Sequence, residues 1–125
     1  MATILVIDDD HFFIELVSLH LLLARHTVQV AKDPEEGLRV IVDSLPDLVL
    51  LDLDLPYMSG FEVLEALRSD PAIRKIPVIM LTAHKDEESY ARCDKIGIDG
   101  FLTKPLQSDR LNEAITAALA AHART

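Results

Sequence analysis

The stretch Asp47-Leu48-Val49-Leu50-Leu51-Asp52-Leu53-Asp54-Leu55-Pro56 decides the fold. Its apolar run, 48–51, lacks the polar alternation of a half-exposed strand and therefore predicts a strand buried on both faces of a parallel sheet. The run ends at Asp52, which is then expected at the carboxyl end of the strand. Because open α/β sheets bind their ligands at that end, Asp52 is a candidate site residue.

Three further apolar runs end in residues that can take part in chemistry. They begin at residues 4, 78 and 101 and end, in chain order, at Asp8-Asp9-Asp10, at Thr82 and at Lys104-Pro105. Parallel strands present their carboxyl ends at one edge of a sheet. We therefore expect several carboxylates, one hydroxyl and one ammonium to meet there.

Strand-like and helix-like segments alternate five times along the chain. The expected strands are 4–7, 27–31, 48–51, 78–81 and 98–103, and the expected helices are 12–24, 34–45, 59–69, 86–95 and 108–122. Asp33, Asp86 and Ser59 have the character of helix N-caps, and Ser59 forms a capping box with Glu62. Alternating βα units of this length predict an α/β fold with a parallel sheet covered by helices on both faces.

Apolar residues at helical spacing predict the buried faces of the helices. For the first helix these are Phe12, Phe13, Leu16, Val17, Leu19, Leu21 and Leu23, and the run Leu21-Leu22-Leu23 is interpreted as core packing. For the second helix they are Leu38, Ile41 and Val42.

Length and composition exclude several classes of protein. The chain has 125 residues, half of them hydrophobic, which predicts a single domain, 1–125, with a real core and no effector domain. Its net charge of −9 argues against direct nucleic-acid binding. It lacks an apolar stretch long enough for a membrane span, and its start does not resemble a signal peptide. Cys93 is the single cysteine, so we expect a reducing, cytoplasmic location and no redox role for its thiol.

The clustered carboxylates indicate a cation site, because like charges repel unless a cation or proton neutralises them. Hard oxygen ligands without a convergent set of His or Cys favour Mg²⁺, with Mn²⁺ as a substitute. Asp9 is expected to bind the metal directly and Asp8 through water. Asp52 and the backbone carbonyl of Asp54 complete the expected ligands.

A carboxylate held beside such a metal can attack a phosphoryl group and become an aspartyl phosphate. Asp52 is the best nucleophile because it stands alone at its strand end. Thr82 and Lys104 can supply the donors that the transferred group needs.

These residues together resemble the receiver domain of response regulators in two-component signalling, of the chemotaxis-regulator type. The resemblance covers essentially the whole chain and is carried by Asp8-Asp9, Asp52 with Pro56 and Gly60 after it, Thr82-Ala83 and Lys104-Pro105. It implies a flavodoxin-like, doubly wound (βα)5 fold with five parallel strands in the order 2-1-3-4-5.

The resemblance also implies roles for these residues. Asp52 would take its phosphoryl group from a histidine kinase or a histidine phosphotransfer protein, and Thr82 and Ala83 would bind that group. The Lys104-Pro105 bond would be cis, and Phe101 would act as the switch aromatic where the family often has tyrosine. Phosphorylation would then alter the surface of the last two helices and the last strand, which would control a protein partner or a homodimer.

Asp54 and His84 lie two residues after the acceptor and two residues after Thr82, at positions that tune the lifetime of the phosphoryl group in the family. The resemblance therefore implies that these two side chains shape that lifetime. The alternative is that both are solvated loop residues.

Two other functions use the same residues differently. Asp52-Leu53-Asp54-Leu55 resembles the nucleophile motif of haloacid-dehalogenase-type phosphatases, with Asp54 as general acid, but that motif normally lies on the first strand. A flavodoxin-like FMN carrier needs a Gly/Ser/Thr-rich loop after the first strand, and 9–12 is instead acidic. We therefore expect a switch and not an enzyme, apart from assistance to its own phosphorylation and dephosphorylation.

Overall fold

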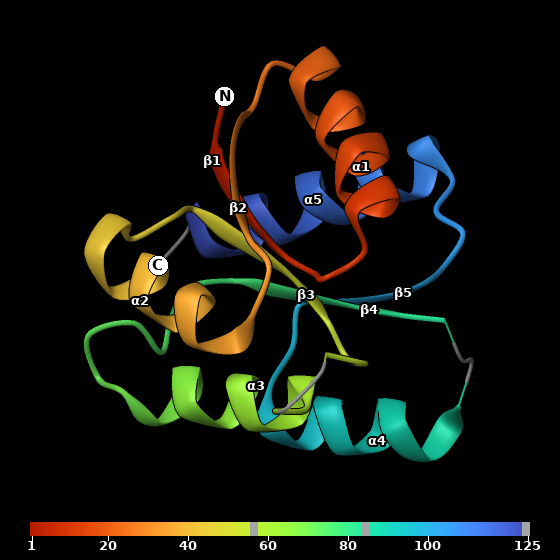
Figure 1. Ribbon diagram of the computed structural model, residues 1–125. Coiled ribbons are helices and arrows are strands. Elements are labelled where there is room, and N and C mark those ends of the chain that lie inside the picture. Colours follow the sequence, from red (N-terminus) through yellow and green to blue (C-terminus); the bar gives the residue numbers. More distant parts are fainter. Residues whose placement is uncertain (56–57, 84–85, 124–125) are drawn as a thin grey trace.

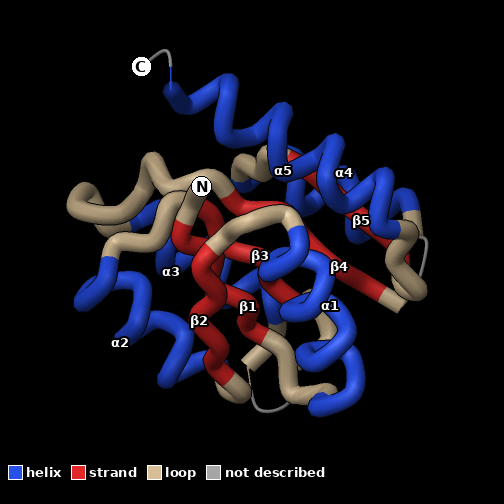
Figure 2. The backbone as a smooth tube through the Cα atoms, turned by 90° about the horizontal axis from the view of Figure 1, so that it is seen from above, coloured by secondary structure: helices blue, strands red, loops and turns tan. Residues whose placement is uncertain are grey.

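A computed structural model describes residues 1–55, 58–83 and 86–123 of the chain (Figure 1). Within these residues, strands and helices alternate as β1 (Thr3–Ile7), α1 (His11–Leu23), β2 (Thr27–Ala31), α2 (Pro34–Ser44), β3 (Leu48–Asp52), α3 (Gly60–Ser69), β4 (Val78–Thr82), α4 (Glu87–Ile96), β5 (Gly100–Thr103) and α5 (Ser108–Ala123). The strands form one parallel sheet in the order β2-β1-β3-β4-β5, which Figure 2 shows from above. The predicted fold class and strand order are confirmed.

Helices cover both faces of the sheet: α1 and α5 lie on one face, and α2, α3 and α4 on the other (Figure 1). Successive side chains of a strand point to opposite faces. Accordingly, Leu48 and Leu50 of β3 join the core beneath α1 and α5, whereas Val49 and Leu51 join the core on the other face. All five residues of β3 are buried, which explains the continuous apolar run.

The helix starts are set by local sequence. The three predicted N-caps are confirmed, each accepting a hydrogen bond from a backbone amide: Asp33 from Glu36 at 2.8 Å, Ser59 from Glu62 at 3.4 Å and Asp86 from Glu88 at 3.0 Å. Asp10 caps α1 by accepting from the amides of Phe12 and Phe13. Asp10 therefore serves the helix, and Asp8 and Asp9 are left for the edge of the sheet.

The predicted buried face of α1 is partly wrong. The helix buries Phe13, Ile14, Val17 and Leu21. It exposes Phe12, Leu16, Leu19, Leu22 and Leu23. Because α1 is apolar on almost every side, periodicity could not fix which stripe faces the sheet. The interpretation of 21–23 as core packing holds for Leu21 alone.

Two smaller expectations also differ from the structure. Val42 of α2 is exposed, whereas Ile41 is fully buried. The last strand begins at Gly100 and not at residue 98. Just before it, the carboxylate of Asp99 accepts the amide of Val78 at 2.9 Å, so a side chain takes the place of a strand carbonyl there.

The amino edge of the sheet is tied together by Arg68 of α3. Its guanidinium donates to the carbonyls of Gly97 at 2.9 Å, Arg74 at 2.7 Å and Ile76 at 2.6 Å, and contacts a carboxylate oxygen of Asp99 at 3.3 Å. Burial lowers the pKa of Arg68, and the neighbouring Asp99 acts in the opposite direction. His122 of α5 reaches the other oxygen of Asp99 at 2.7 Å.

Candidate functional site

Three carboxylates meet at the carboxyl edge of the sheet. In the register of β1 and β3, Ile7 lies opposite Leu51, so the strands deliver Asp8 and Asp52 side by side. One oxygen from each of Asp8, Asp9 and Asp52 lies within 4.8 Å of the others. Asp8 and Asp52 are buried, whereas Asp9 is exposed. This set of hard oxygen donors, partly open to solvent, fits a divalent cation such as Mg²⁺.

Lys104 is the cation that the fold itself brings to these acids. Its Nζ lies 2.8 Å from Asp8 Oδ2 and 3.7 Å from Asp52 Oδ2. The same Nζ lies 4.0 Å from the centre of the Phe13 ring, which holds it on the apolar side. The Lys104-Pro105 bond is cis, as expected. Among the described residues, one ammonium therefore faces three carboxylates, and negative charge is in excess.

The surroundings of Asp52 raise its pKa to about 6. Burial is the main cause, and the charges of Asp8 and Asp54 add to it. The backbone amide of Asp54, which donates to Asp52 Oδ1 at 3.1 Å, and the ammonium of Lys104 act in the opposite direction. Asp52 is thus mostly ionised at neutral pH but is a stronger base than an ordinary aspartate.

Thr82 lies at the end of β4 and is almost fully buried. Its hydroxyl donates to Asp54 Oδ2 at 3.3 Å, and the amide of Ala83 donates to the same oxygen at 3.5 Å. Asp54 is exposed at the mouth of the site. The structure therefore brings Asp54, Thr82 and Ala83 together, whereas His84 and Pro56 lie outside the described residues.

Gly60, at the start of α3, allows the chain to pass close behind the candidate nucleophile. Its amide donates to the carbonyl of Leu53 at 3.0 Å. A Cβ at this position would lie 2.6 Å from Leu53 Cα and 2.7 Å from the carbonyl oxygen of Asp52. Only glycine fits such an approach to backbone atoms. The sequence marks Gly60 by its place in the motif, but the reason is visible only in the structure.

Comparison with known proteins identifies the family of this chain. The model of the response regulator receiver domain family matches residues 4–116. The chain belongs to this family. The receiver interpretation is therefore confirmed, with its place in two-component signalling.

Curated relatives of this receiver domain are response regulators. The chain is 40% identical over 119 residues to the DNA-binding dual master transcriptional regulator RpaA of Synechocystis, covering 95% of this chain and 49% of that protein. It is 36% identical over 117 residues to the phosphate regulon transcriptional regulatory protein PhoB of Pseudomonas aeruginosa, covering 94% of this chain and 51% of that protein. The receiver domain thus spans about half the length of these regulators.

A solved structure agrees with this assignment. A CheY-like response regulator receiver domain protein of Methanospirillum hungatei superposes with a TM-score of 0.92 at 27% identity, covering 99% of this chain and 98% of that one. The family match gives no support to the phosphatase or FMN-carrier alternatives. In the receiver domain Asp52 ends the third strand, whereas the phosphatase motif belongs on the first.

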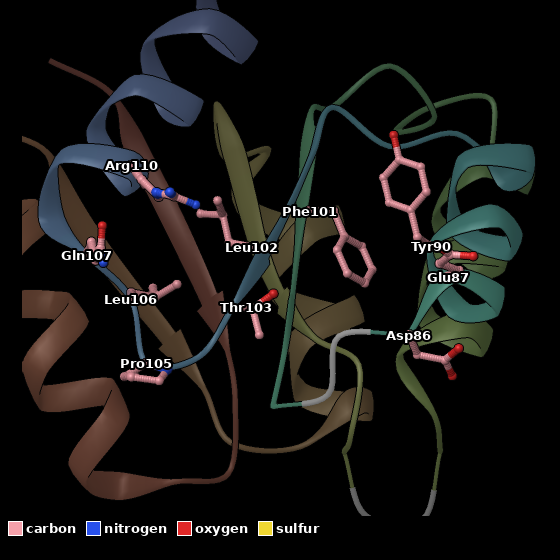
Figure 3. Close-up of a pocket in the computed structure, with 10 residues that line it drawn as sticks. All are labelled: Asp86, Glu87, Tyr90, Phe101, Leu102, Thr103, Pro105, Leu106, Gln107 and Arg110. Atoms are coloured by element: carbon pink, nitrogen blue, oxygen red, sulfur yellow. The ribbon is translucent and has the colours of Figure 1, made fainter.

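Phe101 lies away from the carboxylates, on β5 opposite Met80 of β4. Its ring is half-buried against the core and packs edge-to-face on Tyr90 of α4, with ring centres 5.3 Å apart. Both rings line a cleft of about 640 Å³ between α4 and α5 (Figure 3). Asp86, the N-cap of α4, borders the cleft on one side, and Arg110 of α5 borders it on the other. The predicted switch residue therefore sits on the surface that the resemblance marks as the output face.

Sequence reasoning missed two residues at these sites. Phe13 was expected only as a core residue, and its contact with Lys104 joins positions far apart in the sequence. Tyr90 lies in a largely polar helix, and nothing local marks it as the partner of Phe101. Cys93 is buried, and burial raises the pKa of its thiol to about 11, which disfavours the thiolate form. Among the described residues, no helix has both the length and the apolar character that crossing a membrane requires.

Proposed function

We propose that residues 1–125 form one receiver domain in which Asp52 accepts a phosphoryl group from a phosphohistidine. A carboxylate oxygen of Asp52 forms the new O–P bond while the donor's N–P bond breaks, and the imidazole nitrogen keeps the electron pair. The observation that carries this proposal is the buried carboxylate of Asp52, which lies beside Asp8, the exposed Asp9 and the ammonium of Lys104.

The residues around Asp52 bind the phosphoryl group once it is transferred. Lys104 can shift between Asp8 and a phosphoryl oxygen, because its Nζ is within 4 Å of both strand ends. The hydroxyl of Thr82 and the amide of Ala83 are the donors on the β4 side. Asp8, Asp9, Asp52 and the backbone carbonyl of Asp54 would hold Mg²⁺, or Mn²⁺ in its place, which neutralises charge on the phosphoryl oxygens when bound.

The output is a change in the surface made by α4, β5 and α5. Thr82 accepts the amide of Lys104 at 2.7 Å through its carbonyl, so the end of β4 is tied to the end of β5. A shift of Thr82 toward the phosphoryl group is thereby passed to β5, which carries Phe101 and the floor of the cleft. This surface would control a partner protein or form a homodimer.

The phosphodonor is proposed to dock along α1. The exposed residues Phe12, Leu16, Leu19 and Leu23 follow helical spacing and form one apolar stripe. The stripe begins at Phe12, two residues after the N-cap Asp10, and therefore close to the mouth of the site. A histidine kinase or phosphotransfer protein with an apolar helical face can cover this stripe and bring its phosphohistidine to Asp52.

Other partners are not proposed for these residues. The net charge of −9 disfavours contact with nucleic acid, although a longer relative is named as DNA-binding. Neither membrane binding nor turnover of a separate substrate is part of the proposal. Asp54 and His84 are proposed to influence the lifetime of the aspartyl phosphate.

Intact mass after incubation with acetyl phosphate and Mg²⁺ tests the assignment of Asp52. We expect a gain of one phosphoryl group that needs Mg²⁺ and is absent in Asp52→Asn. Asp43→Asn, an exposed acid on α2, is the control and should behave as wild type. An adduct that persists in Asp52→Asn would contradict the proposal.

A further inference from the structure

The carboxylate of Asp54 already occupies donors that the proposed function reserves for the phosphoryl group. Its Oδ2 accepts from the Thr82 hydroxyl at 3.3 Å and from the Ala83 amide at 3.5 Å. Its own backbone amide donates to Asp52 Oδ1 at 3.1 Å. One residue thus holds the acceptor carboxylate with its main chain and the end of β4 with its side chain.

A carboxylate oxygen and a phosphoryl oxygen accept hydrogen bonds from the same kinds of donor. Both are anionic acceptors, and both bind a hydroxyl and a backbone amide through charge-assisted hydrogen bonds. The two donors converge on a single oxygen of Asp54, as they would on one oxygen of a phosphoryl group bound to Asp52. The Thr82 hydroxyl carries a single hydrogen, so it donates to one of the two anions at a time.

We propose that Asp54 is an internal surrogate for the phosphoryl group. In the unphosphorylated chain its carboxylate holds Thr82 and Ala83, and phosphorylation of Asp52 requires that this carboxylate leaves. Asp54 is therefore an autoinhibitory positioning residue that slows phosphorylation. This inference rests on the proposed roles of Asp52, Thr82 and Ala83.

Repulsion between the charge of Asp54 and an anionic phosphodonor would also slow phosphorylation. This effect must be distinguished from occupancy of the Thr82 and Ala83 donors by the Asp54 carboxylate. Repulsion of an anionic phosphodonor depends on the charge of Asp54 and weakens as salt is added. Occupancy depends on an oxygen that accepts hydrogen bonds at close range, where screening is small. Asp54→Asn removes the charge but keeps an acceptor oxygen, and Asp54→Ala removes both.

The first measurement is the initial rate of phosphorylation by acetyl phosphate with Mg²⁺, at low salt and at 0.5 M salt (~4 Å Debye length). We expect Asp54→Ala to be about threefold to tenfold faster than wild type at both salt concentrations, with Asp54→Asn between them. Asp43→Asn changes the net charge equally and should match wild type. An Asp54→Ala rate equal to wild type, or an advantage that disappears at high salt, would overturn the proposal.

The second measurement is the amide chemical shift of Ala83 without any phosphodonor. In Asp54→Ala the Ala83 amide should lose its hydrogen-bonded shift, and beryllium trifluoride with Mg²⁺, a phosphoryl analogue, should restore it. An Ala83 shift that is identical in wild type and Asp54→Ala would overturn the surrogate role. If no variant that keeps Asp52 formed an adduct, the phosphoacceptor assignment itself would fail, which is a different result from an adduct whose rate ignores Asp54.

Discussion

At the amino edge of the sheet, one carboxylate oxygen of Asp99 accepts hydrogen bonds from the Arg68 guanidinium and from the Val78 amide. The other oxygen contacts the His122 ring. At the carboxyl edge, Asp8 and Asp52 share one ammonium, and Asp9 lies beside them in solvent. Both edges hold acids, but among the described residues only the acid of the first edge is paired with a guanidinium, a backbone amide and an imidazole together. A carboxylate whose hydrogen-bond and charge partners lie within the chain stabilises the fold. Carboxylates that outnumber the cations beside them are available to bind an outside cation and a phosphoryl group.

The largest effect is expected at the satisfied edge. Asp99→Ala leaves the half-buried guanidinium of Arg68 and the amide of Val78 without their acidic partner, which should lower the free energy of unfolding by about 3 kcal/mol. Urea unfolding followed by circular dichroism measures this loss. Asp43→Asn, an exposed control, should stay within about 0.5 kcal/mol of wild type. A loss below about 1 kcal/mol for Asp99→Ala would erase the difference between the two edges.

Removing an acid at the carboxyl edge should instead raise the free energy of unfolding. The pKa of Asp52 is about 6 in the folded chain and 3.8 in the unfolded chain. The contribution of the protonated Asp52 side chain to stability is therefore fully present below pH 3.8 and is lost as the pH rises through 6. At pH 7 with EDTA, Asp52→Asn should raise the free energy of unfolding by about 2 kcal/mol. The gain should vanish near pH 4 in parallel urea titrations. A variant less stable than wild type at pH 7 would show that the acids are already neutralised.

Mg²⁺ should stabilise the protein through the carboxyl edge of the sheet and not through the amino edge. At a tenfold excess over its dissociation constant, a bound ion stabilises the native state by about 1.4 kcal/mol. Wild type and Asp99→Ala should both gain this stability in thermal unfolding with and without EDTA, because their carboxyl edges are the same. Asp9→Asn and Asp52→Asn should gain much less. An equal gain in all four proteins would place the ion elsewhere.

The smallest effect is expected for His122, whose contact with Asp99 is partly open to solvent. His122→Ala should lower the free energy of unfolding by about 0.5 kcal/mol, because Arg68 and Val78 still satisfy Asp99. Amide hydrogen exchange should rise in the last turn of α5 and remain unchanged in β4. A loss as large as that of Asp99→Ala would mean that His122, and not Arg68, is the main partner of Asp99.

Much of the candidate site could be predicted because it depends on local signals. Each strand is a short apolar run, and the residue after it is fixed by the sequence alone. In β1, β3 and β4 the predicted ends lie within a residue of the observed ones. Parallel pairing then brings the acids of β1 and β3 together with Thr82, without any detail of side-chain packing.

Contacts between separate elements could not be predicted in the same way. The position of Phe13 against Lys104 depends on how α1 is rotated over the sheet, and an almost wholly apolar helix does not reveal that rotation. The same uncertainty placed Leu19 and Leu23 in the core, whereas they are exposed. Arg68 and Asp99 were not singled out, because each is an ordinary charged residue until the fold brings it to its partner.

By itself, the sequence determined the alternation of strands and helices, the helix caps and the acids, hydroxyl and ammonium at the strand ends, because hydrophobic periodicity and capping act over a few neighbouring residues. Only the tertiary structure decided that the Asp54 carboxylate accepts hydrogen bonds from Thr82 and Ala83 and that Lys104 lies nearer to Asp8 than to Asp52. It also decided that Asp99 is paired with Arg68 and with the amide of Val78. Those outcomes depend on strand register and side-chain rotamers, which bring together atoms from residues tens of positions apart.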